Sequence, residues 1–235
     1  MQKEENPECS HCNIRRKSIF CELNVGEVLL LNTSKHHSYY QKGQSLFGEG
    51  AYPRGLYCVS HGKIKITQTG VDGKEQIVHL AKSGDVLGYR ALLSGDVYSC
   101  SALAMEDSTV CFIPKDIFHF MVEKNSRLGL QLIRLLSKEL KDTEKKLTRI
   151  AQRPAKERVA QTILMLKDCY GFEKDGNTLD ISLSREEIAS ISGTTRETAI
   201  RALVKLKEDR IIDLPGKKIQ ILNYTVLLKT ANLTD

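Results

Sequence analysis

The fold is decided by the stretch Leu183-Ser-Arg-Glu-Glu-Ile-Ala-Ser-Ile-Ser-Gly-Thr-Thr-Arg-Glu-Thr-Ala-Ile-Arg-Ala-Leu-Val-Lys-Leu-Lys207, in which two short apolar patterns of helical spacing flank one glycine. Ser184 is a candidate N-cap, and Glu187, three residues later, completes a capping box. Gly193 stands where the chain must turn sharply, a conformation that glycine adopts cheaply. We therefore predict two helices joined by a tight turn, a helix-turn-helix.

The two predicted helices have distinct buried faces. Either Thr194 or Thr195 caps the second helix. The residues expected to be buried are Ile188, Ala189 and Ile191 in the first helix and Ala199, Ile200, Leu203 and Leu206 in the second.

The exposed N-terminal face of the second helix carries side chains that can read DNA bases. An arginine can donate two hydrogen bonds to guanine, and a glutamate can accept one from cytosine. A hairpin signal with Pro215-Gly216 at its turn follows in the position of a wing. The competing interpretation is an unrelated helical hairpin whose charges only solvate its surface. The predicted DNA-binding residues are Ser184, Thr194, Thr195, Arg196, Glu197 and Arg201.

Overall charge does not identify this DNA-binding region. The chain of 235 residues has a net charge of +6, from 35 basic and 29 acidic residues. From Pro154 to the end there are 13 basic and 12 acidic residues, whereas Arg127–Arg153 has eight basic and three acidic ones. The DNA prediction therefore rests on the motif.

An amphipathic helix of about 25 residues is predicted before this region, from about Asn125 to Gln152. Its narrow apolar stripe favours a coiled-coil seam with a second copy of the chain. The alternative is that the helix packs on its own β-domain. Arg153-Pro154 then breaks the helix and forms a hinge before a new helix at Ala155. The predicted seam consists of Leu128, Leu132, Leu136, Leu140, Leu147 and Ile150, with Thr143 in phase.

Residues 38–114 have the character of an all-β domain. Apolar and polar residues alternate in Gly62-Lys-Ile-Lys-Ile-Thr-Gln68, as a half-buried strand requires. Val71-Asp-Gly-Lys74 is a strong turn signal. Short strands with frequent glycine turns predict a jelly roll.

Composition excludes several other classes of protein. No apolar run approaches the roughly 20 residues of a membrane-spanning helix, and the N-terminus has no apolar core of a signal peptide. We therefore expect a cytoplasmic protein, in which the seven cysteines do not form a disulfide framework. No paired carboxylates, nucleophile–base arrangement or phosphate-cradling loop indicates an enzyme.

From about residue 20 to residue 225, the chain resembles the bacterial cyclic-AMP receptor/fumarate–nitrate reduction regulator (CRP/FNR) family. Besides the long helix, the resemblance rests on Lys42-Gly-Gln-Ser-Leu-Phe47, Gly55-Leu-Tyr57 followed by Gly62-Lys-Ile-Lys65, Gly84-Asp-Val-Leu-Gly88, and Thr195-Arg-Glu-Thr-Ala-Ile-Arg201. It implies an α+β fold with a cyclic-nucleotide-binding-like β-roll (jelly roll), a long dimerisation helix and a C-terminal winged helix-turn-helix.

This resemblance implies a homodimeric transcription regulator that binds double-stranded DNA and RNA polymerase. Arg196, Glu197 and Arg201 match the family positions that read a TGTGA-like half-site. A ligand- or metal-binding module that acts through protein partners, without DNA, is the rival function. The expected segments are a Cys-containing segment at 1–24, the β-roll sensor at 25–123, the dimerisation helix at 124–152 and the winged domain at 153–235.

The predicted effector pocket departs from the cyclic-AMP pattern. In the cyclic-AMP branch, a Glu follows the Gly-Asp-x-x-Gly turn and an Arg-Ser pair comes about ten residues later. Here Tyr89-Arg90 follows the turn, and the later stretch Asp96-Val-Tyr-Ser-Cys100 has no arginine. Cyclic AMP is therefore not expected. The candidate pocket residues are Gly88, Tyr89, Arg90, Ser99 and Cys100.

The cysteines indicate another kind of signal: redox state, oxygen or nitric oxide. The oxygen-sensing branch binds a [4Fe–4S] cluster through three N-terminal cysteines and one in the β-roll. By resemblance, the candidate ligands are Cys9, Cys12, Cys21 and Cys111, although eight residues separate Cys12 from Cys21 where the family has five. Thiolates are soft ligands that suit iron–sulfur clusters or zinc.

Three alternatives remain open for the sensor. Zinc could bind Cys9, His11, Cys12 and Cys21, or a haem could use His61 or His79. In the third, Cys58, Cys100 and Cys111 are small core residues without a ligand.

Overall fold

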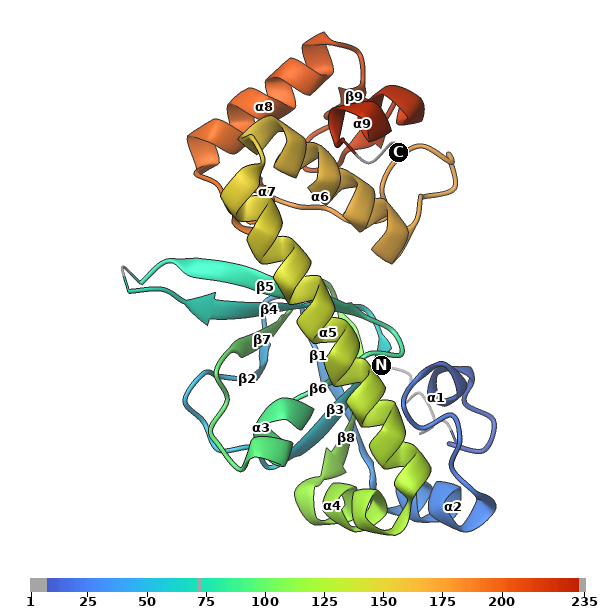
Figure 1. Cartoon of the computed structure of the whole chain (residues 1–235). Coiled ribbons are helices and arrows are strands. Elements are labelled where there is room, and N and C mark those ends of the chain that lie inside the picture. The colour runs from blue at the N-terminus through green and yellow to red at the C-terminus, as the bar shows by residue number, and fades with distance from the viewer. Residues whose placement is uncertain (1–7, 72, 233–235) are drawn as a thin grey trace. The chain divides into compact units, whose positions relative to one another are not determined.

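The computed structural model describes residues 8–71 and 73–232 (Figure 1). These residues form two compact units. The first holds the N-terminal residues up to Gly73 and Val78–Leu140, and the second holds Lys74–Ile77 and the residues from Lys141 onward. Across the described residues, no helix combines the length and the apolar character needed to cross a membrane.

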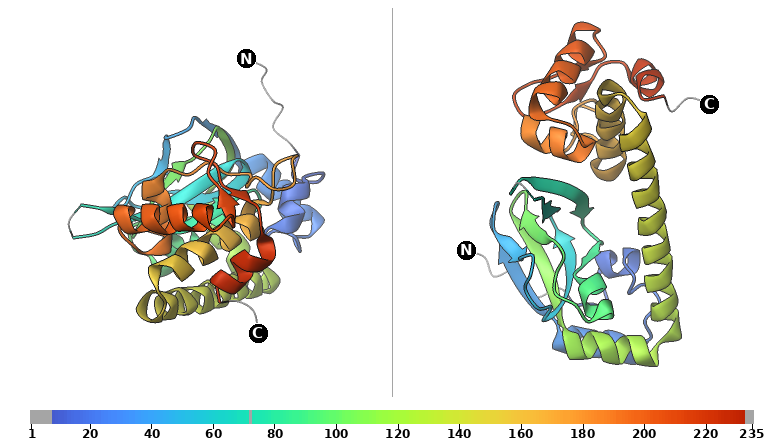
Figure 2. Two further views of the ribbon diagram at one scale, coloured as in Figure 1. Left: turned by 90° about the horizontal axis from the view of Figure 1, so that it is seen from above. Right: turned by 60° about the vertical axis from the view of Figure 1, so that its left-hand side comes forward.

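Two facing sheets build the β-roll of the first unit (Figure 2). One sheet has the order β1-β8-β3-β6 and the other β2-β7-β4-β5. The strands are β1 His36–Tyr40, β2 Ser45–Phe47, β3 Gly55–His61, β4 Lys63–Thr69, β5 Glu75–Lys82, β6 Val86–Leu87, β7 Ser101–Ala104 and β8 Ser108–Pro114. The predicted jelly roll is therefore confirmed, as is the turn between β4 and β5, except for Asp72, which lies outside the described residues.

Helices cover the outer face of the first sheet. They are α1 Asn13–Lys17, α2 Val25–Ser34, α4 Lys115–Lys124 and the beginning of α5 Ser126–Gln152. A further short helix, α3 Tyr89–Ser94, lies inside the stretch that the sequence predicts as all-β. Gly88 precedes this helix and Gly95 follows it, and their φ angles of 86° and 77° lie in the left-handed region that favours glycine.

Strand alternation divides the apolar core of the first unit into two layers. On β3 and β8, Val59 and Val110 point between the two sheets. Leu56, Cys58 and Ile113 point to the opposite face, where they pack with residues of the helices. Because successive side chains of a strand face opposite ways, Cys58 and Cys111 both face the helices and not the interior of the roll.

The long helix α5 has two apolar faces, which corrects part of the predicted seam. Leu128 and Leu132 are 1% and 2% exposed because they pack in the helix-facing core of the β-roll. The exposed row begins at Ile133, which is 59% exposed. It continues at the alternating three- and four-residue spacing of a coiled coil through Leu136, Leu140, Thr143, Leu147 and Ile150.

The second unit is a winged helix-turn-helix. Its elements are α6 Ala155–Tyr170, α7 Arg185–Ser192, α8 Arg196–Glu208, the antiparallel pair β9 Ile212–Asp213 and β10 Gln220–Ile221, and α9 Tyr224–Thr230. The break predicted at Arg153-Pro154 is confirmed, because α5 ends at Gln152 and α6 begins at Ala155. Sequence reasoning missed α9, a short helix of seven residues.

Candidate nucleic-acid interface and thiol pocket

Local hydrogen bonds set the start and the end of α7. The Ser184 hydroxyl accepts from the Glu187 amide at 3.1 Å, and the Glu187 carboxylate accepts from the Ser184 amide at 2.9 Å. Gly193 ends the helix with φ 64° and ψ 45°, in the left-handed region that favours glycine. The predicted capping box and glycine turn are both present.

The second helix of the motif, α8, begins at Thr195. The Thr195 hydroxyl accepts from the Thr198 amide at 3.3 Å, so Thr195 and not Thr194 is the N-cap. Ala199, Leu203 and Leu206 are buried as predicted, whereas Ile200 is only half-buried. This buried face leaves the N-terminal end of α8 pointing outward.

Three charged side chains stand on that exposed end: Arg196, Glu197 and Arg201. The Arg196 Nε lies 3.9 Å from a Glu186 carboxylate oxygen, and both side chains are more than 60% exposed. The Arg201 guanidinium donates to the Thr198 hydroxyl at 3.2 Å. Exposed contacts of this kind contribute little stability, so these guanidinium groups can exchange them for the edge of a base.

A basic cleft of about 420 Å³ lies beside this surface, between the start of α7, the start of α8 and the wing. Arg185, Arg196 and Lys217 bring three cations to its wall. Arg185 donates to the Gly216 carbonyl at 3.1 Å, while its buried Nη1 finds no acceptor among the described residues. Buried donors normally have partners, so this nitrogen is an exception within the described residues. The sequence prediction did not include Arg185 and Lys217, which line the same cleft as Arg196 in the folded chain.

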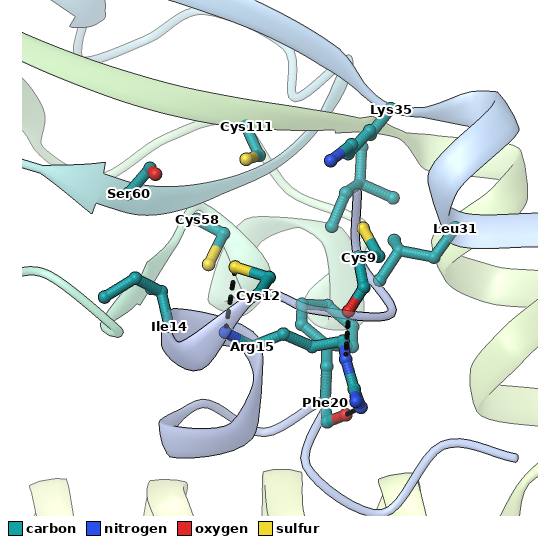
Figure 3. Close-up of a pocket in the computed structure, with 11 residues that line it drawn as sticks. Cys9, Cys12, Ile14, Arg15, Phe20, Leu31, Lys35, Cys58, Ser60 and Cys111 are labelled. Atoms are coloured by element: carbon teal, nitrogen blue, oxygen red, sulfur yellow. Dashed lines mark hydrogen bonds between the residues drawn. The ribbon is translucent and has the colours of Figure 1, made fainter. Parts of the chain in front are cut away.

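The first unit contains a pocket lined by four cysteines (Figure 3). Cys9 and Cys12 come from the N-terminal segment, Cys58 from β3 and Cys111 from β8. The cavity has a volume of about 30 Å³, and Ile14, Phe20, Leu31 and Ile113 give it a mainly apolar wall. Cys21 is exposed and does not line it. The structure therefore brings together three of the four predicted ligands, Cys9, Cys12 and Cys111, and the fourth cysteine of the pocket is Cys58 and not Cys21.

The surroundings of the thiols set their protonation. Burial raises the pKa of the Cys58 thiol, and it raises that of Cys111 to about 11 although the Lys35 ammonium opposes the shift. The Cys111 sulfur also lies 3.2 Å from His37 Nε2. The Cys12 sulfur accepts from the Arg15 amide at 3.4 Å. Among the described residues, no three His, Cys, Asp or Glu side chains form a ready site for a single metal ion.

The histidines proposed for zinc or haem lie elsewhere. The side chain of His11 is 86% exposed and pairs with Glu8. His61 and His79 are also exposed, at the end of β3 and within β5. None of the three lines the thiol pocket.

Aromatic rings occupy the region of the predicted effector pocket. Tyr98 is buried and stacks on Phe47, with ring centroids 4.1 Å apart, and its hydroxyl donates to the Gly55 carbonyl at 3.4 Å. Arg90 lies 3.8 Å from Glu139. Of the other predicted residues, Gly88 and the buried Tyr89 lie at the start of α3, Cys100 is half-buried and Ser99 is exposed.

Together, the β-roll and the winged helix-turn-helix define a class: transcription regulators that join a sensory domain to a DNA-binding domain. The model of the cyclic nucleotide-binding domain matches residues 37–125, and that of the Crp-like helix-turn-helix domain matches residues 157–230. The chain is 31% identical to the fumarate and nitrate reduction regulatory protein of Vibrio cholerae, over 96% of this chain and 91% of that protein. Identity to the anaerobic regulatory protein of Pasteurella multocida is also 31%, over 96% of this chain and 83% of that one.

Solved structures agree with this fold. FixK2 of Bradyrhizobium japonicum aligns with a TM-score of 0.74 at 24% identity, over 83% of this chain and 96% of that one. A CRP/FNR-family regulator of Thermus thermophilus aligns with a TM-score of 0.71 at 23% identity, over 84% and 98% of the two chains. The chain belongs to the CRP/FNR family of transcription regulators. The predicted fold class and the DNA-binding regulatory function are confirmed, and the rival function without DNA is not favoured.

Proposed function

We propose that this regulator works as a homodimer that binds a TGTGA-like palindrome and responds to redox state, oxygen or nitric oxide through its thiol pocket. The observation that carries the sensor part of the proposal is the convergence of four cysteines from three elements on one pocket. The names of the similar proteins from Vibrio cholerae and Pasteurella multocida, which refer to fumarate and nitrate reduction and to anaerobic regulation, point the same way.

The DNA part of the proposal rests on α8. Arg196, Glu197 and Arg201 share one exposed end of this helix, where two guanidinium groups and one carboxylate suit the two G·C pairs of a TGTGA-like half-site. Ser184, Thr194 and Thr195 lie at the turn and the two helix starts beside them. Arg185 and Lys217 would add phosphate contacts, which fix the position of the protein on DNA without reading its sequence.

The dimer part rests on the exposed row of α5. Five apolar side chains, between 36% and 69% exposed, follow a coiled-coil repeat from Ile133 to Ile150. A second copy of the same helix would cover them. The predicted segments, namely 1–24, 25–123, 124–152 and 153–235, then have the roles of thiol-bearing segment, sensor, dimer helix and DNA reader.

An iron–sulfur cluster fits the donor set of the pocket. Cysteine thiolates hold such clusters, and a bound cluster would supply a group whose integrity depends on oxygen and redox state. Cys9, Cys12 and Cys111 would hold it together with a fourth cysteine. Because the cavity is only about 30 Å³, the segment with Cys9 and Cys12 must move outward to admit a group of several atoms.

The shared core gives such a movement a route to α5. Cys9 and Phe20 of the N-terminal segment belong to the same apolar cluster as Leu128 and Leu132 of α5. The Gln131 amide also donates to the Glu22 carboxylate at 2.8 Å. Moving the N-terminal segment would therefore repack the first turns of the dimer helix.

Cyclic AMP is not part of this proposal. The buried Tyr98 ring occupies the stretch where a phosphate-binding arginine would be needed, and Arg90 already faces Glu139. We further propose that the protein acts in the cytoplasm, on promoter DNA and with RNA polymerase.

The test is selection of bound duplexes from a random pool by the full chain, with protein prepared without oxygen and with protein exposed to air. We expect enrichment of a TGTGA-like palindrome and at least a roughly tenfold difference in affinity between the two preparations, with no effect of added cyclic AMP. Enrichment of an unrelated sequence would refute the DNA part. Equal affinity in both preparations would refute the sensor part.

A further inference from the structure

We infer that Cys58, and not Cys21, is the fourth thiolate ligand of an iron–sulfur cluster held by Cys9, Cys12 and Cys111. This inference rests on the proposed sensor function and assigns its ligands. It departs from the ligand set implied by the family resemblance, which includes Cys21 as the third N-terminal cysteine.

Strand pairing places Cys58 beside an expected ligand. Cys58 and Cys111 are direct partners in the antiparallel pair β3–β8. Directly opposed residues point to the same face of a sheet, with their Cβ atoms about 4.5–5.5 Å apart. That face is the one covered by the N-terminal segment, since Cys58 and Cys9 belong to one apolar cluster and Cys111 packs against it.

The N-terminal cysteines close the same site from the other side. In Figure 3, the Cys12 and Cys58 sulfurs point toward one another, and Cys9 and Cys111 lie around the same pocket. The set therefore consists of two neighbouring thiols on the sheet and two on the N-terminal segment that covers it.

Cys21 lacks this placement. It follows Phe20, whose ring is buried in the core, but its own side chain is exposed. Its amide donates to the Ser18 carbonyl at 3.2 Å in a tight turn. For Cys21 to reach the pocket, this turn would have to open and Phe20 would have to leave the core. Cys58 already lines the pocket.

The arrangement suits a polynuclear cluster better than one ion. Four sulfurs around a zinc ion lie roughly 3.8 Å from one another, given the usual Zn–S bond length and tetrahedral angles. No three ligand-type side chains of the described residues are grouped for one ion. In a [4Fe–4S] cluster each thiolate binds a different iron, so the thiols can stand farther apart.

Buried positive charge would stabilise the thiolates. Lys35 is only 5% exposed and lines the pocket on the side of Cys111. Arg15 is half-buried and also lines the pocket, but its guanidinium donates to the Cys9 and Phe20 carbonyls at 2.8 Å. Binding is a ligand exchange: each protein thiol passes its proton to the outgoing thiolate ligand of a synthetic cluster as its sulfur bonds to iron. No sulfur changes its oxidation state.

The test uses the full chain and a synthetic [4Fe–4S] complex with small thiolate ligands, mixed without oxygen. Iron and sulfide per chain, the absorption spectrum and the native mass are measured for the wild-type protein and for Cys58→Ala, Cys21→Ala and Cys100→Ala. We expect about four iron and four sulfide atoms per chain in all but Cys58→Ala, which should retain less than about half. Cys100 is another partly buried cysteine of the β-roll, outside the pocket, and serves as the matched control.

A second variant separates ligation from folding. Cys58→Ser keeps the size of the side chain and offers an oxygen ligand, so we expect cluster uptake with a shifted absorption or Mössbauer spectrum. Cys21→Ser should leave the spectrum unchanged. Full uptake by Cys58→Ala with an unchanged spectrum for Cys58→Ser, or loss of the cluster in Cys21→Ala, would overturn the assignment while the sensor proposal stands. A wild-type chain that takes up no cluster would overturn both.

Discussion

The contact between Arg196 and Glu186 shows how weakly the protein itself holds a side chain that we propose reads a base. The two groups are 3.9 Å apart and mostly exposed, so solvent screens their attraction. Arg196 therefore loses almost no stabilisation when it leaves Glu186 for another acceptor. Removing the guanidinium therefore tests whether Arg196 contributes to the affinity and the sequence preference of DNA binding.

Arg196→Ala should weaken binding to the preferred palindrome by about 1–3 kcal/mol per half-site and relax the preference at one base pair. The reason is loss of a bidentate contact to a base edge. Affinities for duplexes with every base at each half-site position measure this. Lys217→Ala is the control, since loss of a phosphate contact should weaken all duplexes to a similar extent. A uniform loss for Arg196→Ala would show that it does not read a base.

A different residue links the helices of the second unit. The Asp209 carboxylate, at the end of α8, accepts from Lys156 of α6 and pairs with Lys205 of α8, both at 3.1 Å. The hydrogen bonds from Lys156 and Lys205 hold the pKa of Asp209 below its usual value. A carboxyl with a lowered pKa in the folded state stabilises the fold above its unfolded pKa, and this contribution is lost as the pH falls through the folded value.

Asp209→Asn should therefore lower the unfolding temperature at pH 6–8 by a constant amount. The difference from the wild-type protein should shrink below about pH 4, where the wild-type carboxyl takes up its proton. Thermal unfolding followed by circular dichroism from pH 3 to 8 measures it. Glu208→Gln, which removes a longer contact of 3.5 Å to Lys205, should change the unfolding temperature less. A difference that stays the same at pH 3 would rule out this ionic link.

At the scale of elements, α5 combines two roles on opposite sides. Leu128 and Leu132 anchor its first turns in the core of the β-roll, and the row from Ile133 to Ile150 remains exposed. An exposed apolar row of this length is costly in water. In the proposed dimer, a second copy of the helix would cover the row and remove that cost.

Leu140→Glu should raise the dimer dissociation constant at least about tenfold. Leu140 is 62% exposed in the middle of the row, and a dimer would bury this side chain in both copies. Sedimentation velocity over a range of protein concentrations measures the change. Lys138→Glu places the same charge on another exposed position of α5, outside the row, and should leave the dimer intact. If both variants dimerise like the wild-type protein, the row is not the interface.

At the scale of the whole molecule, a homodimer carries two copies of α8. The recognition helices of such a dimer meet half-sites about one helical turn of DNA apart. The spacing of the palindrome is therefore a property of the dimer, and neither α8 nor α5 alone determines it.

Inserting about five base pairs between the half-sites should lower the affinity at least about tenfold, since it turns one half-site to the opposite side of the duplex. Titration of labelled duplexes at constant salt measures this. The same five base pairs placed outside the palindrome should have no effect. Tolerance of the central insertion would mean that each chain binds its half-site independently.

Sequence patterns predicted the local features of this protein well. The capping box at Ser184, the turn at Gly193 and the break at Pro154 all depend on bonds or steric limits within a few residues. Even so, helical spacing could not say which side of α5 faces the β-roll. Leu128 and Leu132 have the same spacing as seam residues, and only the packing of the neighbouring sheet and helices separates them from Ile133.

The amino-acid sequence by itself therefore determined the division into a β-domain, a long helix and a helix-turn-helix, and the residues that face outward from α8, because short-range chemistry decides each of these. Only the tertiary structure decided which thiols share a pocket. Cys58 lies 46 residues after Cys12 and 53 before Cys111 in the chain. The pairing of β3 with β8 and the N-terminal segment over their outer face bring it beside both. The family resemblance favours Cys21, but contacts between distant segments leave Cys21 exposed to solvent and place Cys58 in the pocket.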